Sequence, residues 1–216
     1  MITSSALLKP AVAESETTDE GSALDLAKAG DLEAFDEVYR THAPRLMRHA
    51  VTLCGNPALA EELAQDTLVE AWKCLHRYNE SCQFFTWLCA ILLNRYRNHL
   101  RKQRLLRFFA FGDPAQDDGV GGLEKVEDHG SLPNEAAVLR ERAEVVRKCL
   151  ATLPAKQREV IYLRFYVDDS LEEIAAALGC SVGTVKSRLF HGLEKLRGMK
   201  ALNCESLHFE NKERTQ

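Results

Sequence analysis

The stretch 170–197 constrains the fold more than any other, because its residues predict two helices joined by a tight turn. Ser170 and Glu173 form an S-x-x-E capping box in front of an apolar run. Gly179 can end the first helix in the left-handed conformation, and Ser181 can cap the start of the second. This arrangement is typical of a helix-turn-helix.

The second of these helices separates an apolar stripe from a polar, basic face. The stripe is formed by Val182, Val185, Leu189, Leu193 and Leu196. The other side and its flanks carry Thr184, Lys186, Ser187, Arg188, Phe190 and His191. A solvated face on an amphipathic helix is the ordinary alternative. The absence of carboxylates before Glu194, the small hydroxyls and an outward Phe190 that suits a thymine methyl together favour DNA binding.

Composition excludes several classes of protein. The 216 residues suffice for one or two domains, and the longest apolar run, residues 84–93, is half of the roughly 20 residues that a membrane span needs. The N-terminal segment turns acidic instead of forming a signal peptide, which predicts a cytoplasmic, soluble protein. The seven cysteines include no C-x-x-C pair, so neither a disulfide framework nor a metal or cofactor site is expected.

The formal net charge of −4 is unexpected for a DNA-binding chain, but its distribution is uneven. Residues 84–112 contain no Asp or Glu and hold a run of cations: Arg95, Arg97, Arg101, Lys102, Arg104 and Arg107. Residues 113–128 then reverse the sign. Because an acidic bridge separates the two basic elements, we expect the free chain to bind DNA poorly and to need a partner that arranges it.

Apolar periodicity and breakers predict an all-α fold of two small domains joined by a flexible acidic linker. The expected divisions are a disordered tail over 1–22, a first domain over 23–107, the linker over 108–133, a second domain over 134–199 and a tail over 200–216. Helices are expected over 24–29, 31–54 with a break near Pro44, 58–77, 84–107, 135–152, 154–167 and the two of the helix-turn-helix.

Two segments of the first domain each allow two interpretations. Helix 58–77 carries a polar face that is either simply solvated or a binding surface. Helix 84–107 changes from aromatic to basic. Its aromatic residues are either core or, beside the arginines, a platform for unstacked bases of melted nucleic acid.

Four motifs, taken in order, resemble those of bacterial RNA polymerase sigma factors of the extracytoplasmic function (ECF, group IV) type in the sigma-70 family. They are AEELAQDTLVEAW at 60–72, FFTWLCAILLNRYRNHLR at 84–101, LPAKQREVIYLRF at 153–165, and SLEEIAAALGCSVGTVKSRLFHGLEKLR at 170–197. The resemblance extends over about residues 34–197. It implies that the first domain is sigma region 2 and the second is region 4.

The resemblance also implies a role for each face. The β′ clamp helices of core polymerase would bind Glu62, Gln65, Asp66 and Val69, and the β subunit is a further expected partner of the chain. The −10 promoter element would bind Trp87, Asn94, Arg97, Asn98 and Arg101, with loop 77–83 capturing a flipped base. The −35 element would meet the outer face of the last helix, at Thr184, Lys186, Ser187, Arg188, Phe190 and His191.

Two positions depart from the family's pattern. Many relatives have Asp where this chain has Asn98, and Arg where it has His191, which is mostly neutral at pH 7. The preferred promoter sequence is therefore left open. The short tail after Met199 resembles no sensory domain, which leaves control by a separate anti-sigma factor as an open alternative.

The expected function is that of a sigma factor, a non-catalytic subunit that brings core RNA polymerase to promoter DNA and helps to melt the −10 region. A one-component helix-turn-helix regulator that binds duplex DNA as a dimer is the alternative, although it gives helix 84–107 no role. An enzyme is not expected, because the sequence contains no P-loop, zinc-protease or serine-hydrolase motif, and no catalytic residue is assigned.

Overall fold

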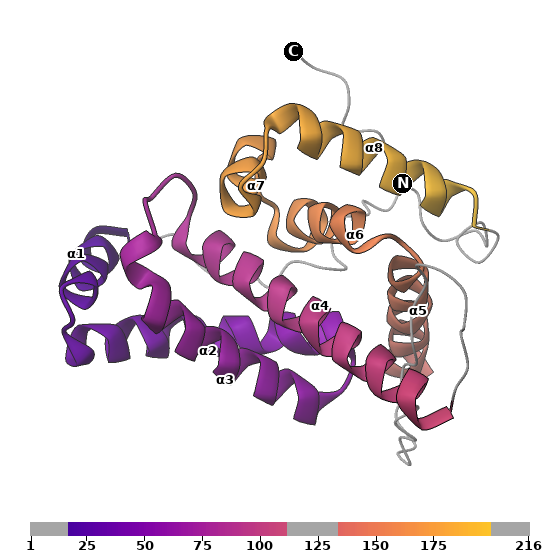
Figure 1. Cartoon of the computed structure of the whole chain (residues 1–216), viewed down its shortest axis with the longest axis horizontal. Coiled ribbons are helices and arrows are strands. Elements are labelled where there is room, and N and C mark those ends of the chain that lie inside the picture. Colours follow the sequence, from indigo (N-terminus) through magenta and orange to yellow (C-terminus); the bar gives the residue numbers. More distant parts are fainter. Residues whose placement is uncertain (1–16, 112–133, 200–216) are drawn as a thin grey trace.

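The computed structural model describes residues 17–111 and 134–199, and this part of the chain is helical throughout, as expected (Figure 1). The first group of helices consists of α1 (Thr17–Lys28), α2 (Leu32–Cys54), α3 (Pro57–Cys74), a 3₁₀ turn at Leu75–Arg77, and α4 (Phe84–Phe111). The second group consists of α5 (Asn134–Ala151), α6 (Ala155–Tyr162), a π-helical turn at Leu163–Val167, α7 (Leu171–Leu178) and α8 (Val182–Arg197).

Local sequence signals set most helix ends. The Asp31 carboxylate caps α2 by accepting hydrogen bonds from the amides of Glu33 and Ala34, and Gly55 ends that helix at a φ of 73°. Asn56 then caps α3, whose first residue is Pro57. Because α2 and α3 are joined by so short a turn, they run side by side and bury their apolar faces against α4.

Three expected boundaries differ from the structure. Helix α1 begins at Thr17, inside the segment expected to be a tail, and α4 continues to Phe111, inside the expected linker. Helix α2 passes through Pro44 without a break. Pro44 removes one amide donor, but the buried apolar positions before and after it hold both halves of α2 against the same core. The rest of the expected tails and linker lies outside the described residues.

The helix-turn-helix forms as its residues predict. Both halves of the Ser170–Glu173 capping box are present, Gly179 has a φ of 60°, and the Ser181 hydroxyl accepts a hydrogen bond from the amide of Thr184. Gly192 allows α8 to pack closely on α6, since a Cβ at this position would lie only 2.7 Å from Cδ1 of Ile161. The apolar stripe of α8 therefore faces inward, with Val185 and Leu196 buried.

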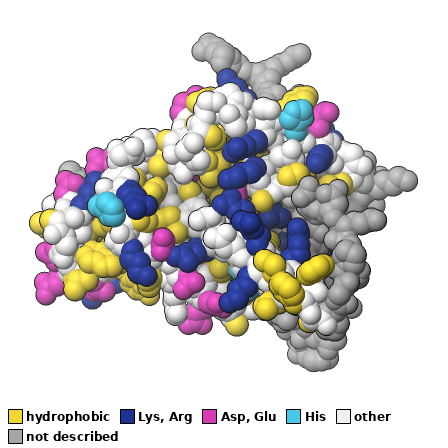
Figure 2. Space-filling model, in the orientation of Figure 1, with side chains coloured by type: hydrophobic (Ala, Val, Ile, Leu, Met, Phe, Trp, Pro, Cys, Tyr) yellow, Lys and Arg dark blue, Asp and Glu magenta, His cyan; other side chains and the backbone are white. Residues whose placement is uncertain are grey.

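The two groups of helices pack directly on each other. In Figure 1, α6 and α7 lie against the N-terminal half of α4, and one apolar cluster includes buried residues of both groups. Figure 2 shows Lys and Arg side chains gathered in a band across the middle of the same face. The sequence predicts two helical domains joined by an acidic linker, and most of that linker lies outside the described residues. The packing of the two groups was not predicted, because a local pattern carries no information about contacts between distant helices.

The described residues form no membrane-spanning helix, three-ligand metal site or disulfide. None of their helices is long and apolar enough to cross a membrane. Nor do they contain a group of three His, Cys, Asp or Glu side chains placed to hold a metal ion, and the six described cysteines are free thiols.

Candidate nucleic-acid interface

The outer face of α8 is open to solvent. Lys186, Ser187 and His191 are exposed, and Phe190 is 57% exposed although it is a large apolar side chain. Two further residues predicted for this face, Thr184 and Arg188, are half-buried. The Thr184 hydroxyl lies 2.9 Å from that of Ser181, and the Arg188 guanidinium lies 3.7 Å from the Cys180 sulfur. The face is thus a shallow polar surface with one projecting aromatic ring.

Helix α4 divides its residues between core and surface. Phe84, Phe85 and Leu88 are buried, so the core interpretation holds for them. Trp87 is half-buried, and its ring lies 5.3 Å from that of Tyr78 and 5.6 Å from that of Phe84. Trp87 is therefore held in place by other aromatic rings while one side remains accessible.

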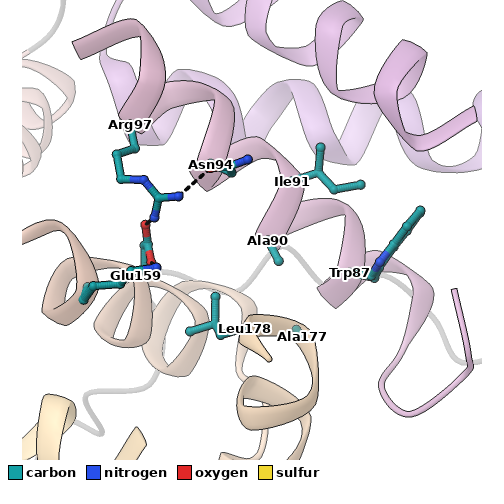
Figure 3. A pocket seen from close by; sticks show the side chains of 9 residues that line it. Trp87, Ala90, Ile91, Asn94, Arg97, Glu159, Ala177 and Leu178 are labelled. Atoms are coloured by element: carbon teal, nitrogen blue, oxygen red, sulfur yellow. Dashed lines mark hydrogen bonds and ion pairs between the residues drawn. The ribbon is translucent and has the colours of Figure 1, made fainter. Parts of the chain in front are cut away.

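The polar half of α4 is partly exposed and partly covered. Asn94, Asn98 and Arg101 are exposed and follow one another at intervals of four and three residues, on one face of the helix. Arg97, between them, donates to the Asn94 side chain and forms an ion pair with Glu159 of α6 (Figure 3). The predicted −10 set is thus close together, but one of its cations is already paired.

A cavity of about 300 Å³ lies at the contact between α4 and helices α6 and α7 (Figure 3). Its apolar lining comes from Trp87 and Ile91 of α4 and from Leu178 of α7, and Arg97 and Glu159 close one end. The half-buried Trp87 is thus part of the wall of this cavity.

Two further polar contacts cross between the groups. The Thr86 hydroxyl donates to the Asp169 carboxylate at 2.7 Å, and both residues are buried. Burial raises the pKa of Asp169 to about 6. The Tyr162 hydroxyl donates to the carbonyl of His49 and lies 3.0 Å from its Nδ1, and burial lowers the pKa of His49 to about 4.

The loop after α3 is held by its own hydrogen bonds. The Tyr78 hydroxyl donates to the carbonyl of Cys82, and the Asn79 side chain accepts from both the amide and the hydroxyl of Ser81. Arg77, Asn79 and Gln83 are exposed. This loop lies directly before the N-terminus of α4, which begins at Phe84.

The predicted docking residues lie on the outside of α3. Glu62, Gln65, Asp66 and Val69 are all exposed, whereas Leu63, Leu68 and Ala71 on the opposite side are buried. Val69 is 53% exposed among polar neighbours. The Gln65 amide donates to the Glu61 carboxylate at 3.3 Å, within the same helix.

Comparisons with known proteins identify the family. The sigma-70 region 2 model matches residues 38–105, and the sigma-70 region 4 model matches residues 143–196. The ECF RNA polymerase sigma factor RpoE of Cereibacter sphaeroides is 31% identical over 170 residues, which are 77% of this chain and 86% of the relative. The sigma factor EcfG of Rhodopseudomonas palustris is 33% identical over 156 residues, 72% of this chain and 79% of the relative.

This chain belongs to the ECF family of RNA polymerase sigma factors. It is a promoter-specific sigma factor, and the one-component regulator is not favoured. The first group of helices contains region 2, and the second contains region 4. From here on, α2 to α4 are called region 2 and α5 to α8 region 4.

Solved structures of sigma factors resemble this one. CnrH, solved with the cytosolic domain of CnrY, has a TM-score of 0.58 and 26% identity, covering 87% of this chain and 99% of its own. The sigma factor RpoE of Bartonella quintana, solved with the anti-sigma factor NepR, has a TM-score of 0.55 and 27% identity, covering 81% of this chain and 100% of its own.

The residues that join the two regions carry no clear signal in the sequence. Glu159, Tyr162 and Asp169 were assigned no role, although each contacts a side chain or carbonyl of region 2. One signal was available for Glu159, a carboxylate inside the otherwise basic and apolar stretch 154–165. No pattern indicated that its partner would be Arg97.

Proposed function

We propose that this sigma factor reads its promoter with two separate faces and docks on core polymerase with a third. The outer face of α8 reads the −35 element, the polar half of α4 reads and helps to open the −10 element, and the outer face of α3 binds the polymerase. The single observation that best supports this proposal is that most predicted residues are exposed on the outside of their helices, including Asn94, Asn98 and Arg101 of α4.

The α8 face suits the major groove. Ser187 and His191 project from the side opposite the buried Val185, where they can meet base edges. Lys186 and Arg188 flank them and can contact phosphates, and Phe190 can contact a thymine methyl. The half-buried Thr184 is close to the helix N-terminus, where the backbone of DNA can approach.

The α4 face suits a strand that is being separated. Asn94 and Asn98 can donate and accept hydrogen bonds at the edges of unpaired bases, and Arg101 can hold the backbone. Arg97 can add a second backbone contact, and Trp87 offers a ring on which an unstacked base can pack. The loop 77–83 lies next to this face and is the proposed receptor of the flipped base.

The α3 face suits a protein partner. Val69 supplies an exposed apolar contact within a polar rim, as protein interfaces commonly do. Glu62, Gln65 and Asp66 would pair with basic and polar groups on the β′ clamp helices. In this role the chain supplies binding and no catalysis of its own, and it acts in the cytoplasm, where the polymerase meets the chromosome.

Transcription from a promoter library tests the two DNA faces. Core polymerase with the wild-type chain, with Asn98→Asp or with Ser187→Ala transcribes templates randomised at both elements. We expect Asn98→Asp to change the selected −10 sequences only, and Ser187→Ala the −35 sequences only. Glu194→Gln, on the C-terminal part of α8, is the matched control. Unchanged selection by both variants would contradict the assignment of these faces.

A pull-down with core polymerase tests the docking face. Asp66→Arg reverses a charge on the outside of α3 and leaves the buried side untouched, so we expect weaker capture of a folded protein. Capture equal to that of the wild-type chain would remove this face from the interface.

We also propose that an anti-sigma factor controls this chain, because the Bartonella relative was solved with one. A purified candidate inhibitor should abolish transcription in the same library assay, and added sigma factor should restore it.

A further inference from the structure

We infer that region 4 covers the side of the −10 face that carries Trp87 and Arg97, and that the Glu159 carboxylate takes the place of a DNA phosphate on Arg97. The packed arrangement is then an autoinhibited state, and region 4 must leave α4 before the −10 strand can bind. This inference rests on the proposed role of α4 in reading the −10 element.

The ion pair between Arg97 and Glu159 is the first observation. The Glu159 side chain is only 5% exposed and that of Arg97 is 26% exposed, so both lie mostly out of water. The Lys156 ammonium lies 3.5 Å from the second Glu159 oxygen. A phosphate oxygen and a carboxylate oxygen bind a guanidinium in the same way, and DNA and Glu159 therefore compete for one cation.

The charges around Glu159 are the second observation. Burial lowers the pKa of the Arg158 guanidinium, and the positive charges of Arg104 and Arg97 lower it further. Glu159 thus lies among cations of both regions. Without its negative charge these cations would repel one another, and the contact between region 4 and α4 would weaken.

The position of the cavity is the third observation. Trp87 and Asn94 line the cavity from α4, while Ala177 and Leu178 of α7 face them (Figure 3). A strand stacked on Trp87 would need the space that α7 occupies or borders. Region 4 therefore restricts access to the ring as well as to the cation.

Two buried carboxylates favour opening of this cover. Oδ2 of Asp169 accepts no hydrogen bond from any residue that the structure describes, and Oε2 of Glu159 has the Lys156 ammonium 3.5 Å away but accepts no hydrogen bond from a described residue. Burying a carboxylate oxygen without a hydrogen bond costs free energy. Opening removes this cost, because water can then donate hydrogen bonds to the oxygen. By contrast, the outer faces of α3 and α8 stay exposed in the packed state. Core polymerase can therefore dock first, while Trp87 and Arg97 of the −10 face are still covered.

Binding of single-stranded DNA by the free chain tests the inference. The probe is a labelled oligonucleotide with the −10 sequence selected in the library assay, and its fluorescence anisotropy is measured at pH 7.5. Glu159→Gln removes the competing charge, and Thr86→Val breaks the contact with Asp169 without touching the proposed DNA face. Each should tighten binding about tenfold, because apparent affinity scales with the open fraction.

Distance measurements report opening independently of DNA. Dyes attached through unnatural amino acids at Glu61 and Lys195, both exposed, give a transfer efficiency that falls when region 4 leaves α4. Glu194→Gln is the control, since it removes one exposed charge of region 4 that pairs with Arg197 of the same helix. It should change neither binding nor transfer efficiency.

The outcomes separate this inference from the proposed role of α4. Wild-type transfer efficiency and wild-type DNA affinity in both Glu159→Gln and Thr86→Val would overturn the inference, and so would an equal gain in Glu194→Gln. Opening without tighter binding, together with no effect of Arg101→Ala in the opened chain, would instead overturn the −10 assignment.

Discussion

Helices α4 and α8 are the two proposed DNA-binding elements of this chain, and they differ in what surrounds them. The outer face of α8 contacts no other helix in the described part of the structure, and only its apolar stripe is buried. Helix α4 is packed on α2 and α3 on one side and on region 4 on the other. One helix is thus specialised for DNA, whereas the other is both the main support of the fold and a shared binding surface.

The difference has a consequence for assembly. A face that is always exposed can sample duplex DNA at any time, but a face that is paired with another part of the chain acts only after a rearrangement. Opening of the −10 region is useful only when polymerase is present. Keeping α4 covered until then would couple melting to assembly.

The largest expected effect is a loss of stability, which compares how much α4 and α8 contribute to the core. Leu88 of α4 is fully buried in the apolar cluster that both regions share. Leu88→Ala should lower the free energy of unfolding by about 2–5 kcal/mol. Leu193→Ala, on the half-buried edge of α8, should lower it by about 1 kcal/mol. Urea denaturation followed by circular dichroism measures both, and equal losses would show that α8 contributes as much to the core as α4.

The contrast between the helices also explains how much of the structure could be predicted. The caps Ser170, Glu173 and Ser181 act on amides at most three residues away, so the sequence showed the helix-turn-helix directly. The exposed α8 face follows from its helical period alone. The Arg97–Glu159 and Thr86–Asp169 contacts join residues 62 and 83 positions apart, and no local pattern indicates such pairs.

The next effect concerns the role of α4 within the polymerase. Asn94→Ala combined with Arg101→Ala removes two exposed polar side chains from the proposed −10 face without touching the core. Promoter binding should persist through α8, while strand opening should fall about tenfold or more, since each base or backbone contact contributes roughly 1–3 kcal/mol. Permanganate reactivity of promoter thymines, compared with footprinting of bound polymerase, separates the two steps. Equal opening at equal occupancy would remove these residues from the −10 interface.

A smaller effect is expected from the α8 face. His191→Arg places a permanent cation at an exposed position opposite the buried Val185. If this position meets base edges, the change should alter preference at one −35 position by roughly 1–3 kcal/mol. Transcription from a −35 library at two salt concentrations measures this. A uniform gain for all sequences, with a steeper dependence on salt, would place His191 against the backbone.

The smallest expected effect is the pH dependence of packing between the two regions. It is small because two titratable groups at the contact respond to acid in opposite directions. In the packed state the pKa of Asp169 is about 6 against an ordinary 3.8, mainly because of burial and despite the hydrogen bond from Thr86. Between these values the packed state binds a proton that the open state lacks, so acid favours packing. The pKa of His49 is about 4 against an ordinary 6.5, because of burial and of Arg45 and Arg48. Between those values the open state binds the extra proton, so acid favours opening.

The two effects oppose each other between about pH 4 and 6, and single substitutions should reveal them. When the pH falls from 7.5 to 5, the transfer efficiency between dyes at Glu61 and Lys195 should change little in the wild-type chain. It should fall in Asp169→Asn, where only His49 titrates, and rise in His49→Gln, where only Asp169 does. Dye-labelled chains at nanomolar concentration avoid association near the sequence pI of about 6.0. Equal pH profiles in all three chains would show that neither group changes its burial when the regions separate, and hence that α4 is not uncovered in this way.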